Sequence, residues 1–74
     1  MTLADLKKGD SVRINAVDTT ASSVQRLMTL GFVEGAELTF IGASLGGDPL
    51  EFLLHGSAVS LRRDDARSFT VVGN

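Results

Sequence analysis

Residues 36–61 have the sequence AELTFIGASLGGDPLEFLLHGSAVSL, and this stretch carries most of the information about the class of fold. Apolar and polar side chains alternate in it with a period of two, the spacing of half-buried β-strands. The residues expected to face the core are Ala36, Leu38, Phe40, Leu50, Phe52, Leu54, Val59 and Leu61. Glycine-rich segments at 46–49 and 55–56 separate the runs and predict the turns of hairpins.

The segment before this stretch predicts a single α-helix. Three apolar residues fall at helical spacing and form one stripe: Val24, Leu27 and Met28. Polar residues at 18–20 and 22–23 offer candidate N-caps. Gly31 lies where a residue in the left-handed conformation would end the helix, and we expect Phe32 to fold back onto Leu27, as commonly happens beyond such an ending.

The N-terminal residues predict a helical turn followed by a strand. Thr2 and Asp5 have the spacing of a capping box around one turn, and a second turn follows at 9–10. Residues 11–17 then alternate in the manner of a half-buried strand. Three of them are expected to share the inward face: Val12, Ile14 and Ala16.

The C-terminal residues add a second helical turn and a last strand. Residues 62–66 predict the turn, in which the carboxylates at 64–65 suit the positive end of a helix and act as caps. The arginines at 62–63 are expected to be solvated, although Arg63 could pair with an acid. Residues 68–72 predict the strand, with Phe69 and Val71 turned inward.

Together these elements predict one mainly β domain over residues 1–74. It contains about five short strands, one inserted α-helix and two short helical turns. Short strands at this spacing are typical of a small sandwich or barrel. We expect closure of the sheet, because closure removes the strand edges that invite aggregation.

Composition excludes several classes of function. Seven basic and nine acidic residues give a net charge of -2, and no basic tract is longer than a pair. Proteins that bind nucleic acids usually present a basic face to the phosphates. The sequence has no cysteine and no apolar run near the ~20 residues needed to span a membrane. We therefore expect a cytoplasmic protein without a nucleic-acid partner and without direct membrane insertion.

Residues suited to catalysis or to ligand binding are few. His55 is the single histidine, and its place before Gly56 favours a hairpin turn over a metal site shared with Asp48 or Glu51. The glycine-rich segment 42–48 lacks the lysine of a P-loop. We therefore predict no enzymatic activity, no cofactor and no metal site.

Apolar residues outside the predicted core are the remaining candidates for function. They lie at outward strand positions or in loops: Val33, Ile41, Leu45 and Leu53. A contiguous exposed patch would mark a docking site, whereas scattered apolar residues are ordinary on a small protein. The sequence leaves both interpretations open.

Four segments, taken in order, resemble the FeoA proteins, which are small cytoplasmic accessories of the bacterial ferrous iron transporter. The segments are LADLKKGD at 3–10, QRLMTLGFVEGA at 25–36, GDPL at 47–50 and LRRDDA at 61–66. The resemblance extends over nearly the whole chain. It implies a small SH3-like β-barrel with one inserted helix.

The resemblance also implies a partner, the cytosolic GTPase part of the membrane permease FeoB. The chain would then be a non-enzymatic accessory or regulator of ferrous iron uptake, peripheral at the inner face of the plasma membrane. The residues expected to contact the partner are Arg26, Leu27, Val33, Leu45 and Leu53, although the apolar stripe also favours a core position for Leu27. The family is associated with transition metal ions, yet no residue here matches a strong iron ligand.

An alternative is an SH3-like regulatory module related to the C-terminal domain of iron-dependent repressors. Such a module would bind a peptide or protein partner. No helix-turn-helix motif precedes the predicted barrel, which disfavours a repressor. Grooves that bind proline-rich peptides are lined by aromatic residues, and this chain has four phenylalanines but no tryptophan or tyrosine.

Overall fold

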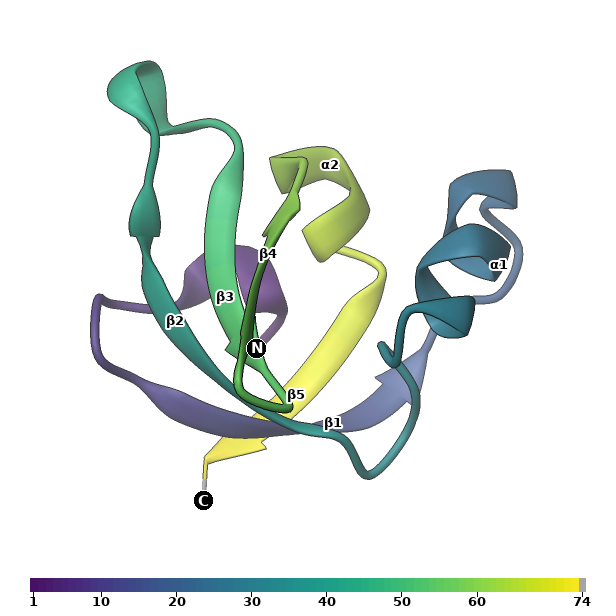
Figure 1. Cartoon of the computed structure of the whole chain (residues 1–74). Coiled ribbons are helices and arrows are strands. Elements are labelled where there is room, and N and C mark those ends of the chain that lie inside the picture. The colour runs from purple at the N-terminus through teal and green to yellow at the C-terminus, as the bar shows by residue number, and fades with distance from the viewer. Residues whose placement is uncertain (74) are drawn as a thin grey trace.

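The computed structural model describes residues 1–73, in which five antiparallel strands form one sheet (Figure 1). The strands are β1 (Ser11–Val17), β2 (Glu37–Ala43), β3 (Leu50–Leu54), β4 (Ser57–Leu61) and β5 (Phe69–Gly73). The helical elements are the 3-10 turns η1 (Leu3–Asp5) and η2 (Leu45–Gly47) and the helices α1 (Ser22–Thr29) and α2 (Arg63–Ala66). The predicted mainly β fold with one substantial helix is confirmed, and η2 is a turn that the sequence did not predict.

The sheet curls on itself but does not close. Its strand order is β4-β3-β2-β1-β5, and β1 crosses the base of the molecule beneath the β2–β3–β4 meander (Figure 1). Strands β4 and β5 end this order and do not pair with each other within residues 1–73. The expectation that closure removes all strand edges is therefore wrong. The molecule is barrel-like, and β4 keeps a free edge.

The core fills the inside of the curled sheet. Alternation buries Leu50, Phe52 and Leu54 along β3, as predicted. Two pairs of aromatic rings pack in the core with centroids 5.7 Å and 5.4 Å apart: Phe32 with Phe69 and Phe40 with Phe52. The first pair joins the segment after α1 to β5, whereas the second is a cross-strand pair between the neighbouring strands β2 and β3.

One strand residue faces the opposite way from its prediction. We expected Ala16 on the inward face of β1, but it is exposed. Ile14 pairs with Val71, whereas Ala16 pairs with Thr70, so β1 has one residue more than β5 between the two pairs. This β-bulge shifts the alternation. As a result, Val17 is the residue that packs against the core.

Helix α1 ends as the sequence predicts. Gly31 has φ +114, and its N–H donates to the Met28 carbonyl oxygen at 3.1 Å. The N–H of Phe32 donates to the Leu27 carbonyl oxygen at 3.3 Å. These two bonds define a Schellman motif. They direct the chain out of α1 and carry Phe32 into the core.

The start of α1 differs from the prediction. The N-cap residue is Ala21, and no side chain caps the helix. Of the candidate caps, Asp18 instead accepts bonds from the N–H and the hydroxyl of Thr20. Ser23 lies within the helix and bonds to α2 rather than to its own backbone. One candidate cap is therefore used in a local turn before the helix, and another is used in a tertiary contact.

The N-terminal turn η1 is anchored to the sheet. The predicted capping box between Thr2 and Asp5 is present, and Leu3 is fully buried. The N–H of Val71 in β5 donates to the Met1 carbonyl oxygen at 2.9 Å. As η1 packs on α2 and β5, it covers one end of the core.

Candidate functional site

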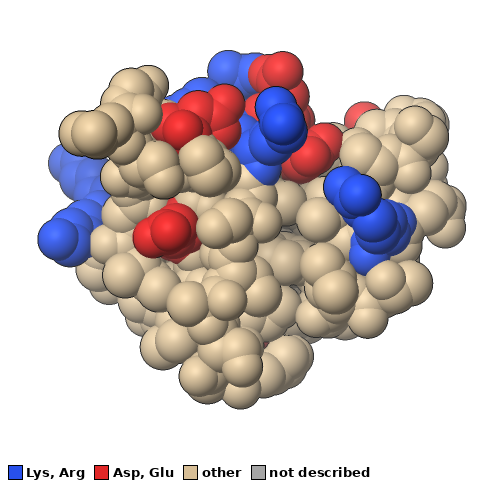
Figure 2. Space-filling view, turned by 45° about the horizontal axis from the view of Figure 1, so that its top comes forward, with Lys and Arg blue, Asp and Glu red and all other residues tan. Residues whose placement is uncertain are grey.

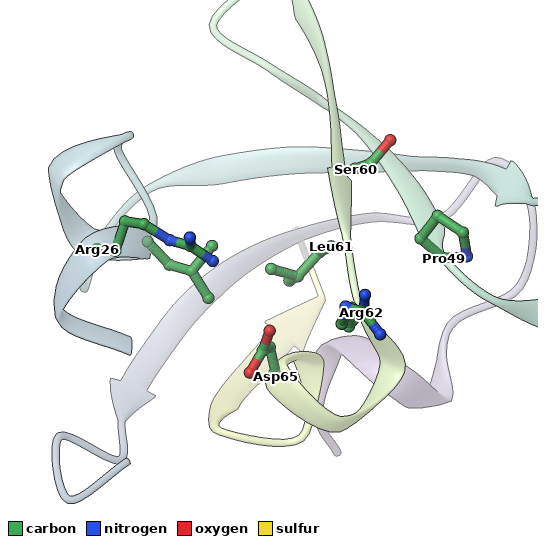
Figure 3. A pocket seen from close by; sticks show the side chains of 7 residues that line it. Arg26, Pro49, Ser60, Leu61, Arg62 and Asp65 are labelled. Carbon is green, nitrogen blue, oxygen red and sulfur yellow. The ribbon is translucent and has the colours of Figure 1, made fainter. Parts of the chain in front are cut away.

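A cleft of about 280 Å³ separates α1 from β4 and α2. The side chains that line it are Arg26, Leu27, Pro49, Ser60, Leu61, Arg62 and Asp65 (Figure 3). Figure 2 shows a hollow between the lobe at the right, which contains α1, and the rest of the molecule. Basic side chains lie on both sides of this hollow (Figure 2). We refer to it as the α1–β4 cleft.

The packing of α1 determines one wall of the cleft. Val24 and Leu27 are buried, so the helix is fixed in rotation about its own axis. Arg26 is exposed, and its guanidinium group extends into the cleft (Figure 3). The hydroxyl of Ser23 donates to Oδ1 of Asp65 at 2.7 Å. This bond joins the first turn of α1 to α2 and holds the two walls together.

The charged side chains that line the cleft differ in whether they have hydrogen-bond partners. Within residues 1–73, no hydrogen bond or ion pair engages the guanidinium group of Arg26 or that of Arg62. Asp65 accepts the bond from Ser23. The rim therefore offers two uncommitted positive groups. Below them, Leu27 and Leu61 form an apolar floor.

The position of the Arg63 side chain differs from its prediction. The sequence predicted a solvated side chain, but Arg63 is half-buried. Its Nη1 donates to the carbonyl oxygen of Ala4 at 3.1 Å, and its Nη2 donates to that of Gly47 at 2.9 Å. Its backbone N–H donates to Oδ1 of Asp48 at 3.0 Å. Arg63 therefore ties together η1, η2 and α2.

The acids that follow it do not cap α2. We expected capping by the carboxylates of Asp64 and Asp65, but Arg62 is the N-cap residue, without a side-chain cap. Asp64 pairs with Arg67 one turn along. Oδ1 of Asp65 accepts the hydrogen bond from the hydroxyl of Ser23. The first turn of α2 still contains both acids, which suits the helix dipole.

The five residues expected to contact a partner do not form one surface. Arg26 and Leu27 line the α1–β4 cleft. Val33 is partly exposed in the loop after α1. Leu45 is fully exposed in η2, at the top left of Figure 1 and away from α1. Leu53 lies with Ile41 in a separate shallow apolar groove on the outside of β2 and β3.

Sequence reasoning missed most of the cleft. Pro49, Ser60 and Arg62 were not predicted to act with Arg26, because at least 20 residues separate them from it in the chain. The pairing of β3 with β4 and the position of α1 bring these residues together. The adjacent arginines of LRRDDA at 61–66 were the one local signal of this part of the cleft, but the sequence did not distinguish the roles of Arg62 and Arg63.

His55 occupies a turn, as predicted. It has φ 52 and precedes Gly56 with φ 81, the backbone of a tight hairpin turn. Its ring lies over Gly31, since a Cβ placed there would be 3.4 Å from the ring. Within residues 1–73 no group of three or more His, Cys, Asp or Glu side chains could hold a metal ion. No helix in that range is long and apolar enough to span a bilayer.

The sequence model of the FeoA domain matches residues 1–72. The chain belongs to the FeoA domain family. A Porphyromonas gingivalis protein, a fusion of Fe(2+) transport protein A with the Fe(2+) transporter FeoB, is 32% identical over 71 residues. The alignment covers 96% of this FeoA chain but only 8% of the fusion protein. The family predicted from the sequence is confirmed.

Solved FeoA structures share the fold. The solution structure of FeoA from Chlorobium tepidum has 36% identity and a TM-score of 0.88, covering 99% of this chain and 70% of that one. Stenotrophomonas maltophilia FeoA complexed with zinc, described as a procaryotic SH3 domain protein, has 29% identity and a TM-score of 0.84. That match covers 97% of this chain and 89% of the other. The SH3-like description of the fold is confirmed.

The fold also occurs in a repressor. The manganese-activated repressor ScaR has 18% identity and a TM-score of 0.85, with 100% of this chain matching 35% of the repressor. At this identity the likeness concerns the fold alone. The predicted structural relationship between FeoA domains and metal-dependent repressors is therefore confirmed, without consequence for DNA binding.

Proposed function

We propose that this chain is a non-enzymatic accessory of bacterial ferrous iron uptake that docks on the cytosolic GTPase part of a FeoB-type permease. The observation that supports docking is the Porphyromonas gingivalis relative, in which the two proteins share one polypeptide. A covalent link gives two domains a high local concentration. Where the domains are separate chains, a complementary surface has to supply the association instead. Such docking would hold the chain at the cytoplasmic face of the membrane through its partner.

The α1–β4 cleft is our candidate for that surface. It is concave, it has an apolar floor, and its rim carries two arginines whose guanidinium groups have no internal partners in residues 1–73. Arginine is enriched at the energetic centres of protein interfaces because its planar group forms several bonds at once. Arg26 and Leu27 belong to this surface. Val33, Leu45 and Leu53 remain predicted partner contacts outside it.

Titration of the chain against the purified cytosolic domain of a FeoB-type permease tests the proposal. We expect association, and we expect Arg26→Glu to weaken it at least tenfold, about 1.4 kcal/mol. Arg13→Glu is the matched control, because Arg13 is an exposed arginine on β1 and does not line the cleft. The titration is repeated with and without guanine nucleotide. Failure to associate under either condition would overturn the proposal.

A further inference from the structure

The α1–β4 cleft contains the free edge of strand β4. Strand β4 is last in the sheet order and pairs only with β3. The two-residue turn His55–Gly56 places Leu54 opposite Ser57. In such a hairpin, the residues next to the turn exchange both backbone hydrogen bonds, and the pattern alternates from there. Ser60, which lines the cleft, belongs to this edge.

The register of β4 against β3 shows which backbone groups of β4 point away from the sheet. Ser57, Val59 and Leu61 direct their N–H and C=O groups toward β3. Ala58 and Ser60 direct theirs away from the sheet. Within residues 1–73, no backbone bond from outside the strand ladders reaches either residue. The edge therefore presents two donor and acceptor pairs at the spacing that another strand requires.

Strand β4 lacks three of the features that protect such an edge: charge, proline and a bulge. Natural edge strands are blunted by lysine, by proline, or by bulges that twist them away from a neighbour. The sequence of β4 is SAVSL, without charge or proline. Its pairing with β3 runs over five consecutive residues without a register shift. The edge is therefore competent to accept a further strand.

The charges of the cleft define what that strand contains. Arg26 lies across from the edge on α1, and Arg62 follows β4 directly. A carboxylate between them would receive charge-assisted hydrogen bonds from both guanidinium groups. Asp65 is a counter-charge in the same cleft, but its Oδ1 already accepts the bond from Ser23. The apolar floor suits an aliphatic side chain beside the acid.

We propose that an extended acidic segment of the protein partner adds as a strand to the free edge of β4, with a carboxylate bound between Arg26 and Arg62. This inference rests on the proposed function, which supplies the partner. Strand addition derives affinity from main-chain hydrogen bonds and specificity from side-chain pockets. The arginines select acidic segments, and the outward groups of Ala58 and Ser60 fix the segment in register.

Amide hydrogen exchange locates the bound segment without altering the protein. The ¹⁵N-labelled chain is mixed with the cytosolic domain of a FeoB-type permease, and exchange is followed residue by residue. We expect the amides of Ala58 and Ser60 to slow at least about tenfold on binding, because both acquire hydrogen bonds. Binding that protects other amides and leaves these two unchanged overturns the inference while the proposed function stands. Absence of any binding overturns both.

Two substitutions at Ser60 distinguish the contribution of its backbone N–H to binding from that of its side-chain hydroxyl. Ser60→Pro removes the outward N–H while keeping the bonds between β3 and β4, since proline is tolerated at outward positions of edge strands. Ser60→Ala removes only the hydroxyl. We expect Ser60→Pro to weaken binding about tenfold or more, and Ser60→Ala to leave it within about twofold. Equal binding by both variants would overturn strand addition.

The double variant R26E/R62E tests the carboxylate and serves also if Ser60→Pro fails to fold. Peptides of about 12 residues that tile the permease domain are the probes. We expect acidic peptides to bind the unaltered chain and to lose binding to the double variant, because like charges repel across a partly desolvated cleft. Selection of basic peptides would overturn the inference. Concentration-dependent protection of Ala58 and Ser60 in the chain alone would assign the edge to a second copy and overturn it as well.

Discussion

Two adjacent arginines have opposite roles in this protein. Arg63 turns inward and donates to two carbonyl oxygens from distant segments, those of Ala4 and Gly47. Arg62 is exposed at the cleft, and its guanidinium group has no hydrogen-bond partner within residues 1–73. The difference arises because Arg62 is the extended N-cap residue before α2, whereas Arg63 is the first residue of the helix and faces η1 and η2. One arginine supports the fold and the other remains available for a ligand.

We expect Arg63→Ala to lower the free energy of unfolding by about 2–3 kcal/mol, because two carbonyl oxygens lose a charged donor. Arg62→Ala is the matched control, and its effect should stay within about 0.5 kcal/mol. Urea denaturation of both variants measures the difference. Equal stabilities of the two variants would contradict the role assigned to Arg63.

Two carboxylates link stability to pH. The N–H of Thr2 donates to Asp5 and holds its pKa below the ordinary value of 3.8. The hydroxyl of Thr20, together with its N–H, lowers the pKa of Asp18 in the same way. A lowered pKa in the folded state means that folding favours the charged form. The resulting stability is complete well above pH 3.8 and is lost as pH falls through that value toward the folded-state pKa.

We expect the double variant D5N/D18N to lose less stability than the unaltered protein between pH 6 and pH 3, about the range in which these carboxylates take up protons. Thermal unfolding followed by circular dichroism at several pH values measures this dependence. Parallel curves for the two proteins would show that neither carboxylate contributes.

At the scale of elements, α1 is held to the molecule by a small number of contacts. Val24 and Leu27 are its buried residues. Ser23 bonds to α2, and the Schellman motif directs the following chain into the core. Leu27 and the adjacent Arg26 both line the cleft, so the packing that fixes α1 also forms the cleft wall. The packing of α1 on the core therefore determines the shape of the candidate site.

We expect Leu27→Ala to cost about 2–5 kcal/mol of unfolding free energy, the range for truncating a buried leucine. Leu27 is 5% exposed, whereas Leu30 in the same region is 59% exposed. Leu30→Ala is therefore the control, with an expected effect within about 0.5 kcal/mol. Thermal melts measure both. A melt unchanged by Leu27→Ala, together with loss of partner binding, would place Leu27 in the docking surface instead of the core.

At the scale of the whole molecule, a chain of 74 residues without cysteine depends on complete coverage of its core. A domain of this size buries only about 60% of the surface that its unfolded chain exposes. Because β4 and β5 do not pair, the sheet alone does not enclose the core. The turn η1 packs on α2 and β5 and buries Leu3. The first residues of the chain are thus part of the core.

We expect Leu3→Ala to destabilise the protein by about 2–5 kcal/mol, a large share of the 5–15 kcal/mol typical of natural domains. Leu3 is fully buried in η1, so the substitution leaves a cavity. Lys7→Ala changes an exposed residue a few positions later and provides the control. Urea midpoints that agree for the two variants would show that η1 is dispensable.

The sequence by itself determined the features that depend on near neighbours. The alternation along β3, the capping box of Thr2 and Asp5, the glycine ending of α1 and the turn at His55 were all predicted correctly. Each involves residues at most a few positions apart. Their geometry follows from backbone sterics and local hydrogen bonds, which are the same in any fold.

The tertiary structure alone decided the rest. The bulge that exposes Ala16, the inward turn of Arg63 and the convergence of Arg26 with Ser60 depend on which strands pair and in which register. Of the cleft, only Arg26 and Leu27 had been predicted as partner contacts. Register is chosen by the packing of the whole core, because shifting one strand by a single residue turns all of its side chains to the other face. No local pattern contains that information.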